Sequence, residues 1–293
     1  MTRIIVTGAD GQLARELARL SGSSECAECE FVFARRAELD ITSRQSVSSF
    51  LDAHPTDVIV NCAAYTAVDR AESDATAALR VNSEGVANLA CEAAERDVTL
   101  VHISTDYVFD GSARVPYTEN DATSPLSVYG ETKRQGEREM QASGCRGIII
   151  RIGWLYSAEG HNFVRTIAAK AQTESELRVV ADQWGTPTWA ADLAAAILHI
   201  VPQLKGRDLR GEVFHYADEG ETSWWELADT IVGMMRSECV VLPITTDEWP
   251  TAARRPEYAV LDKTKIKSWF GVDVPDWEVS LERCLRQMNV YRD

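Results

Sequence analysis

The chain has 293 residues, of which 45% are hydrophobic, so it is long enough and apolar enough to bury a large core. Its 45 acidic and 30 basic side chains give a formal net charge of −15, which opposes binding to a phosphate backbone. We therefore expect no nucleic-acid partner. No apolar run approaches the roughly 20 residues that span a bilayer, so we also expect no membrane partner.

The opening segment MTRIIVTG predicts a strand from Arg3 and leaves no space for the charged and apolar regions of a signal peptide. Seven cysteines are scattered along the chain. Only Cys26 and Cys29 have the spacing of a redox or metal-binding pair, and no second pair accompanies them, so we interpret them as surface thiols. These features predict a protein of the reducing cytoplasm.

Apolar, β-branched runs alternate with segments of helical periodicity along the first half of the chain. The runs predicted as buried strands begin at Arg3, Phe31, Asp57, Thr99, Gly147 and Leu177. The segments predicted as helices between them are 11–20, 43–54, 77–97 and 127–143. This order predicts an α/β fold with a doubly wound parallel sheet of the Rossmann type and right-handed crossovers.

The pattern loosens after about Trp154, where 222–235 and 276–288 have helical periodicity among shorter strands. We expect residues 1–153 to form the Rossmann domain. Residues 154–293 would form a smaller C-terminal α/β part, mainly for binding substrate, with about 177–201 returning to the Rossmann domain. The two parts would enclose a cleft, because such a sheet binds ligands beyond the carboxyl ends of its strands.

The first strand runs into TGADGQLAREL, where Gly8, Gly11 and Ala14 have the spacing of a dinucleotide-binding turn. Glycines at a strand-to-helix junction let the backbone turn tightly and approach a pyrophosphate at the helix N-terminus. Glycine pairs at strand ends also make turns without any ligand. The position at the start of a βαβ unit favours the dinucleotide site.

The second strand ends in Arg35 and Arg36, where an acid would hold the 2′-hydroxyl of an NADH ribose. Arginine guanidinium groups suit a 2′-phosphate, so this pair predicts NADPH as the cofactor, with NADH also accepted. Two solvated arginines are the alternative interpretation. With a dinucleotide bound here, Asp40 and Ile41 would flank its adenine.

Tyr129 and Lys133 lie one turn apart on the helix that is predicted from Ser127. A phenol with a pKa near 10 is a slow acid-base catalyst at neutral pH, and a neighbouring ammonium group would lower that pKa by stabilising the phenolate. Thr105, at the end of the fourth strand, would hydrogen-bond the same carbonyl oxygen. The three side chains predict a carbonyl-reduction site, against the alternative of a Tyr and a Lys that merely pack on a helix.

The chain resembles the extended short-chain dehydrogenases/reductases and, within them, the dTDP-4-dehydrorhamnose reductase family, over nearly its whole length. The segments that carry the resemblance are GADGQLA, DVIVNCAAYTAVDRAE, STDYVFDG, YTENDATSPLSVYGETKRQGE, RIGWLY, GHNFVRTI, ADQWGTPT and RRPEYAVLD. It implies NADPH- or NADH-dependent reduction of the 4-keto group of dTDP-4-dehydro-L-rhamnose to dTDP-L-rhamnose. The partner would be this small sugar nucleotide, and a homodimer is compatible with the resemblance.

The resemblance also implies roles for single residues. Tyr129 would donate the proton, and Lys133 would be its electrostatic partner and a ribose ligand. The implied substrate residues are Thr105, Asp106 and Trp154, although simple core burial would also explain Trp154. The implied cofactor residues are Gly11, Gln12 and Leu13 at the pyrophosphate and Ala64, Tyr65 and Thr66 along the dinucleotide. We expect no metal, because Trp189, Ala190 and Ala191 follow GTPT where some relatives have an acidic ligand.

Three alternatives stay open at this point. A sugar-nucleotide 4,6-dehydratase resembles the same superfamily but has Thr-Asp-Glu where this chain has Thr105-Asp106-Tyr107, and its chemistry needs the additional carboxylate. A 4-epimerase uses the same Tyr and Lys, and only the family-specific segments disfavour it. A non-catalytic regulatory subunit like the methionine adenosyltransferase β subunit is similar in the same segments.

Overall fold

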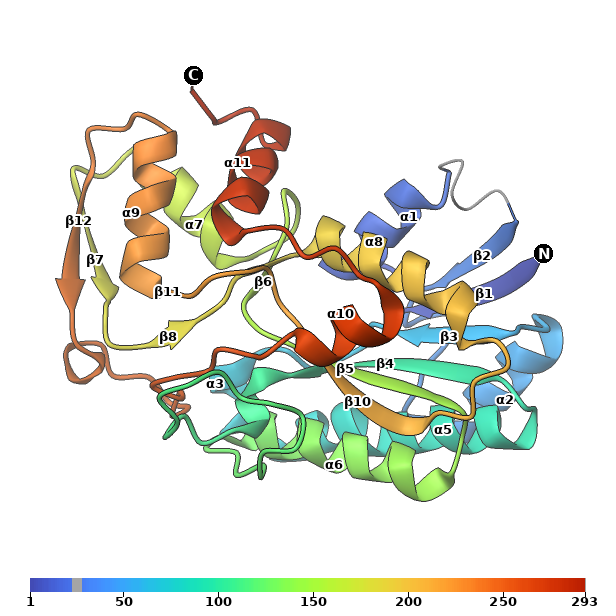
Figure 1. Ribbon diagram of the computed structural model, residues 1–293. Coiled ribbons are helices and arrows are strands. Elements are labelled where there is room, and N and C mark those ends of the chain that lie inside the picture. The colour runs from blue at the N-terminus through green and yellow to red at the C-terminus, as the bar shows by residue number, and fades with distance from the viewer. Residues whose placement is uncertain (23–27, 293) are drawn as a thin grey trace.

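The computed structural model describes residues 1–22 and 28–292 (Figure 1). The described residues form a six-stranded sheet in the order β10-β5-β4-β3-β1-β2, in which every neighbouring pair is parallel. Its strands are β1 (Thr2–Thr7), β2 (Cys29–Ala34), β3 (Val58–Asn61), β4 (Thr99–Thr105), β5 (Gly147–Ile152) and β10 (Arg210–Tyr216). The predicted doubly wound Rossmann sheet is confirmed. Cys26 lies outside the described residues, so the interpretation of the Cys26 and Cys29 pair stays a prediction.

One predicted strand lies elsewhere. The run from Leu177 forms β7 (Glu176–Val180), but β7 pairs with β12 (Val240–Ile244) in a separate two-stranded parallel sheet. The outward residues of β7 alternate with buried ones, whereas every residue of β5 is buried. The sixth position of the main sheet belongs to β10, which pairs with β5 and was not predicted.

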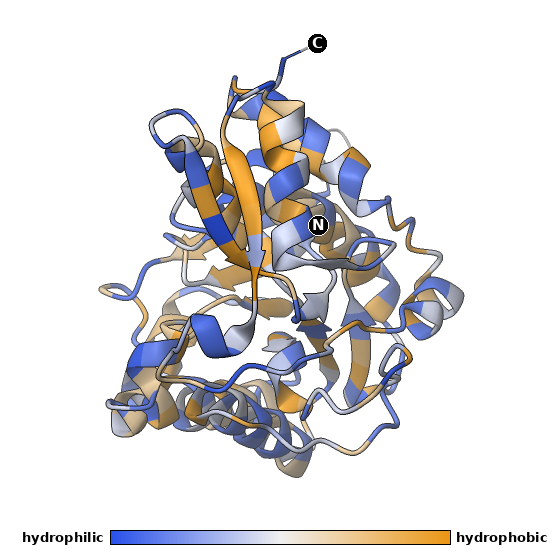
Figure 2. Cartoon of the chain, turned by 90° about the vertical axis from the view of Figure 1, so that its left-hand side faces the viewer, coloured by the Kyte–Doolittle hydropathy of each residue, from blue (hydrophilic) through white to orange (hydrophobic). Residues whose placement is uncertain are grey.

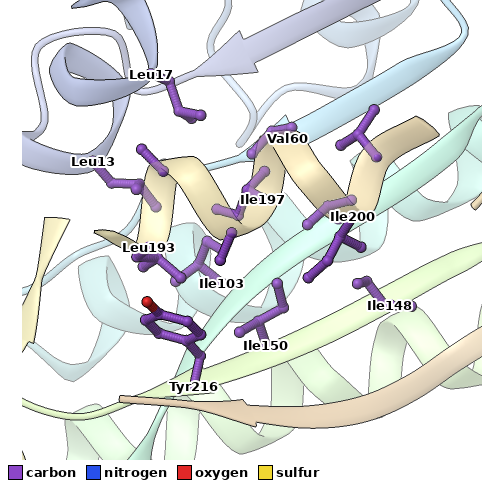
Figure 3. Packing of buried hydrophobic residues seen from close by; sticks show 14 of the residues in the cluster. Leu13, Leu17, Val60, Ile103, Ile148, Ile150, Leu193, Ile197, Ile200 and Tyr216 are labelled. Carbon is purple, nitrogen blue, oxygen red and sulfur yellow. The ribbon is translucent and has the colours of Figure 1, made fainter. Parts of the chain in front are cut away.

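Helices cover both faces of the main sheet, which explains why its strands are apolar on both sides. Successive side chains of β1 point to opposite faces, so Ile4 and Val6 pack in one cluster and Ile5 in another. The first face is covered by α1 (Gln12–Leu20), α8 (Ala190–Ile200) and α10 (Thr264–Phe270). The second face is covered by α2 (Arg44–Ala53), α5 (Gly85–Glu95) and α6 (Val128–Ser143). Figure 3 shows Leu193, Ile197 and Ile200 of α8 between α1 and the strands.

Side-chain caps mark several helix starts that the sequence predicted. Ser43 accepts a hydrogen bond from the Ser46 N–H at the start of α2, and Ser127 accepts one from the Gly130 N–H at the start of α6. The predicted helix over 77–97 is divided by a π-helical turn at Arg80–Glu84. The helices beside this turn are α5 and α4 (Ala75–Leu79), which follows the short α3 (Val68–Ala71).

The C-terminal part lies beside the carboxyl ends of the main strands (Figure 1). Its core joins α7 (Phe163–Lys170), α9 (Trp224–Met234) and α11 (Trp277–Gln287) to the sheet of β7 and β12. Figure 2 shows apolar residues concentrated in the strands and hydrophilic ones on the outer faces of the helices. The short strands are β6 (Leu155–Tyr156), β8 (Trp184–Gly185), β9 (Thr188–Trp189) and β11 (Thr222–Ser223).

The stretch 177–201 is shared between the two cores, since β7 packs in the C-terminal core and α8 packs against the main sheet. The domain boundary at 153 itself stays a prediction. Among the helices of the described residues, none combines the length and the apolar character that crossing a membrane requires.

Candidate active site

A cavity of about 720 Å³ opens at the carboxyl ends of β1, β3, β4 and β5, where a doubly wound sheet binds its ligands. Residues from both parts of the chain line it. The predicted site residues among them are Gly8, Gly11, Gln12, Leu13, Arg36, Asp40, Ile41, Ala64, Tyr65, Thr66, Thr105, Asp106, Tyr129, Lys133 and Trp154. The structure thus brings almost the whole predicted set to one cavity.

The glycine turn lies where β1 meets α1. Gly8 has a φ of +67°, and a Cβ there would lie 2.9 Å from the Cα of Ala63, so a side chain is excluded. The Gly11 N–H donates to the Gly8 carbonyl at 2.8 Å, and Gly11 is the N-cap of α1. The turn therefore presents the N-terminus of α1 to the cavity, which suits a pyrophosphate.

The two arginines after β2 are placed differently. Arg36 lines the cavity, and its charge contributes to the lowered pKa of Asp40, which is caused mainly by the Thr42 hydroxyl. Arg35 is not among the described residues that line the cavity, and its Nε lies 3.4 Å from the carboxylate of Asp10, which does line it. A role in binding a 2′-phosphate is therefore better supported for Arg36 than for Arg35.

A polar clamp holds the loop after β3. Asn82, in the π-helical turn, accepts a hydrogen bond from the Tyr65 N–H at 2.8 Å and donates one to the Tyr65 carbonyl at 3.1 Å. Its amide also donates to the hydroxyl of Thr132 on α6. No motif in the sequence singles out Asn82, although π-helical turns recur at functional sites. The clamp fixes the loop of Ala64, Tyr65 and Thr66 against the cavity.

The start of α6 brings Tyr129 to Thr105. A Cβ on Gly130 would lie 2.2 Å from the Tyr107 carbonyl oxygen, so glycine is needed for the first turn of α6 to come this close. The Thr105 hydroxyl is close enough to lower the pKa of Tyr129, and the Tyr129 ring meets the Tyr107 ring edge-on, with 5.7 Å between the ring centroids. The predicted phenol and hydroxyl therefore meet at one point of the cavity.

Burial dominates the ionisation of the catalytic candidates. It raises the pKa of Tyr129 to about 12, with the Thr105 hydroxyl lowering it and the charge of Asp106 raising it. The lowered phenol pKa expected from the sequence was wrong for this structure, because Lys133 is itself buried and its Nζ donates to the Ile103 carbonyl at 2.6 Å. Burial lowers the pKa of Lys133 to about 8, although the charge of Glu137 raises it.

Asp106 is a buried acid that forms no ion pair with any of the described residues. Its Oδ1 accepts from the Thr105 hydroxyl at 2.9 Å, whereas Oδ2 has no hydrogen-bond partner among the described residues. Burial raises the pKa of Asp106 to about 7, against the hydrogen bond from Thr105. A buried, unsatisfied oxygen at a cavity wall suits a polar ligand group such as a sugar hydroxyl.

Trp154 lines the cavity from the start of the C-terminal part. Its ring stacks on Trp224 of α9 with 3.5 Å between centroids and 9° between planes. Its φ of +40° is rare for a residue with a side chain and signals local backbone strain. Strain at a cavity wall is typical of functional positions, so the wall role is better supported than simple core burial.

Comparisons with known proteins identify a family for this chain. The family model of the RmlD substrate binding domain matches residues 1–290. The chain belongs to this family. A dTDP-4-dehydrorhamnose reductase of Aggregatibacter actinomycetemcomitans is 37% identical to it over 303 residues, with 100% of both chains covered. A dTDP-4-keto-6-deoxy-D-glucose reductase of Streptomyces niveus is 38% identical, with 98% of both covered.

The family likeness extends to three dimensions. The structure of dTDP-4-dehydrorhamnose reductase from Bacillus anthracis str. Ames, in complex with NADP, has a TM-score of 0.90 and 34% identity to this chain. It covers 98% of this chain and is itself covered completely. The match includes both the sheet and the C-terminal part.

In this member of the RmlD family, several lining residues are ones to which the sequence assigned no role. Asn162, the N-cap of α7, donates from its amide to Gln12 Oε1 at 2.7 Å and so holds the side chain that follows the glycine turn. His161 and Trp224 also line the cavity. The segment GHNFVRTI was recognised only as a family segment, because no local spacing predicts that it folds back onto the glycine turn.

Proposed function

We propose that this protein reduces the 4-keto group of dTDP-4-dehydro-L-rhamnose to give dTDP-L-rhamnose, with NADPH as the reductant. The observation that carries the proposal is that Tyr129, Thr105, Lys133 and the glycine turn all line one cavity, in which the Thr105 hydroxyl acts on the pKa of Tyr129. The names and the NADP complex of close members of the family support the same reaction.

The cavity fits the cofactor at three points. Gly8 leaves no space for a side chain where the backbone would approach the pyrophosphate, and the N-terminus of α1 supplies N–H groups. Arg36 lines the same cavity and would bind the 2′-phosphate. NADPH bound there would supply the hydride for the keto carbon.

The proton comes from Tyr129. Because its pKa is raised to about 12, the phenol keeps its proton at neutral pH and can give it to the keto oxygen as negative charge develops there. The Thr105 hydroxyl, which donates to Asp106 in this structure, would stabilise the resulting phenolate by turning its proton toward it. The buried Lys133 supplies a positive charge one turn away on α6.

The substrate end of the cavity favours reduction over dehydration. Asp106 and Trp154 would contact the sugar, and Asp106 Oδ2 would accept a hydrogen bond from one of its hydroxyls. Tyr107 stands where a 4,6-dehydratase has a glutamate, and burial raises its pKa, so it supplies no base to take the C5 proton.

The test is turnover of purified protein with NADPH and dTDP-4-dehydro-L-rhamnose, following nicotinamide absorbance and the product. We expect one NADPH oxidised per dTDP-L-rhamnose formed, and no 4-keto product from dTDP-glucose. A parallel assay with dTDP-4-keto-6-deoxy-D-glucose decides which configuration of the sugar is preferred. Binding of NADPH without turnover of either keto sugar would contradict the proposal and favour a regulatory subunit.

A further inference from the structure

A buried ion pair lies directly behind the catalytic side chains. Glu137 of α6 accepts from Arg151 of β5 through both carboxylate oxygens, at 2.9 and 2.7 Å, and also accepts from the Ser104 hydroxyl. Both charged residues are at least 95% buried. Arg151 also lies over the ring of Phe109, 5.2 Å from its centroid.

Stability alone does not explain this pair. Taking two charges out of water costs about as much as their attraction returns, so apolar residues of similar volume would hold the same elements together as well. Its position gives another reason. Ser104 directly precedes Thr105 on β4, and Glu137 lies one turn after Lys133 on α6.

Two polar contacts therefore join α6 to consecutive residues of β4. Lys133 donates to the carbonyl of Ile103, and Ser104 donates to Glu137. Together these contacts fix how far Thr105 lies from the face of α6 that carries Tyr129. Arg151 anchors the carboxylate from the next strand, one residue before Ile152, which lines the cavity.

We propose that Glu137 is a positioning residue for the reduction: its carboxylate, held by Arg151, sets the end of β4 that presents Thr105 and faces the ammonium of Lys133 from the next turn of α6. This inference rests on the proposed function. It assigns a role to a residue that touches neither the cofactor nor the sugar.

The charges around Lys133 support this role. The groups whose charges act on it or respond to it are the Cys62 thiol after β3, His102 on β4 and Glu137 on its own helix. Burial raises the pKa of Cys62 to about 12 and lowers that of His102 well below its usual value, so both are neutral at pH 7. The paired carboxylate of Glu137 raises the pKa of Lys133 against its burial.

The test compares pH profiles of kcat for the wild type and three variants. Glu137→Gln keeps the shape and one acceptor oxygen but removes the charge that raises the pKa of Lys133. Lys133 should then lose its proton at lower pH, and the loss of activity on the alkaline side should move to lower pH by about one unit. Glu137→Asp keeps the charge and shortens the side chain, so kcat should fall several-fold with the alkaline limb in place. Ser104→Ala should behave like Glu137→Asp. Because Ser104→Ala leaves the ion pair of Glu137 and Arg151 intact, it still tests the inference if Glu137→Gln folds poorly.

The matched control is Glu92→Gln, which neutralises another buried carboxylate, between Arg44 and Arg96 on the α2 and α5 side of the sheet. It should lower stability without moving the profile. An alkaline limb that stays at the wild-type pH in Glu137→Gln would overturn the inference, as would a full wild-type kcat in both Glu137→Asp and Ser104→Ala.

A second readout separates this inference from the proposed function. The titration of Lys133 can be followed by NMR of the protein labelled with [13C]lysine, with Lys133→Met to assign the signal. Glu137→Gln should shift that titration to lower pH whether or not any sugar is reduced. Wild-type protein that is inactive on keto sugars would refute the proposed function alone, whereas an unshifted Lys133 titration would refute the role of Glu137.

Discussion

Replacing Lys133 by Met should abolish the proposed chemistry and yet stabilise the folded protein at neutral pH. The ammonium is fully buried, and burial lowers its pKa from the ordinary 10.5 to about 8. Folding therefore opposes protonation of this group. Met has a similar length and shape without the charge, and residues tuned for function often carry such a cost in stability.

The magnitude follows from that pKa. A fall from 10.5 to about 8 corresponds to about 3 kcal/mol of unfavourable free energy in the charged folded state. Loss of the hydrogen bond to the Ile103 carbonyl removes about 1 kcal/mol of stabilisation. We expect Lys133→Met to raise the free energy of unfolding by about 1 to 2 kcal/mol at pH 7.

The sign depends on pH. Between pH 8 and 10.5 the unfolded chain holds more protons on this lysine than the folded one, so the stability of the wild type rises with pH across that window. The advantage of the variant should be full below pH 8 and should vanish by about pH 10.5. Urea unfolding followed by tryptophan fluorescence at pH 7 and pH 10 measures both values.

Lys205→Met, at an exposed position, is the control and should show no such difference. The reasoning would be refuted by a Lys133→Met variant that is less stable than wild type at pH 7, with a gap that does not change with pH. Such a result would mean that the ammonium contributes more to the fold than its burial costs.

Three further predictions concern the same cavity. Tyr129→Phe removes only the phenolic oxygen and its proton, so kcat should fall roughly 10² to 10⁴-fold while the Kd of NADPH is kept; unchanged turnover would exclude Tyr129 as the acid. Arg36→Ala should weaken NADPH by about tenfold to a hundredfold and NADH little, with a smaller effect for Arg35→Ala; equal losses of NADPH and NADH in calorimetry would exclude a 2′-phosphate contact. Because the pKa of Asp106 is raised from 3.8 to about 7, wild-type stability should fall between about pH 4 and pH 7. Asp106→Asn should therefore be more stable than the wild type at pH 8, by at most about 4 kcal/mol in the free energy of unfolding. A difference between variant and wild type that is the same at pH 5 and pH 8 would contradict this.

The Rossmann sheet was predictable because its central strands are short apolar runs at regular spacing, each followed by a helical segment. The edge strand β10 escaped prediction because Arg210, Glu212 and His215 interrupt its apolar pattern. The strand β7 was assigned to the wrong sheet for the opposite reason. Its apolar residues Leu177, Val179 and Val180 favoured a main-sheet strand, but its pairing with β12 and the exposed Glu176 and Arg178 show that it belongs to another sheet.

The residues of the site could likewise be predicted only in part from the sequence. Side chains at strand ends and helix starts, such as Gly8, Thr105 and Tyr129, could be found from motif spacing, because the fold brings those ends together. Asn162 and Trp224 reach the cavity from the C-terminal part, and no spacing in the sequence predicts such a contact. The raised pKa of Tyr129 was also out of reach, since it depends on burial.

The most direct test of the account follows the hydrogen itself. Protein supplied with NADPH carrying deuterium at the transferred C4 position and with dTDP-4-dehydro-L-rhamnose should give dTDP-L-rhamnose with one deuterium at C4 of the sugar, as read by mass spectrometry and proton NMR. Tyr129→Phe should slow this transfer without relocating the label. Product without deuterium, deuterium at another sugar carbon, or a sugar converted with no net oxidation of NADPH would contradict carbonyl reduction at this site.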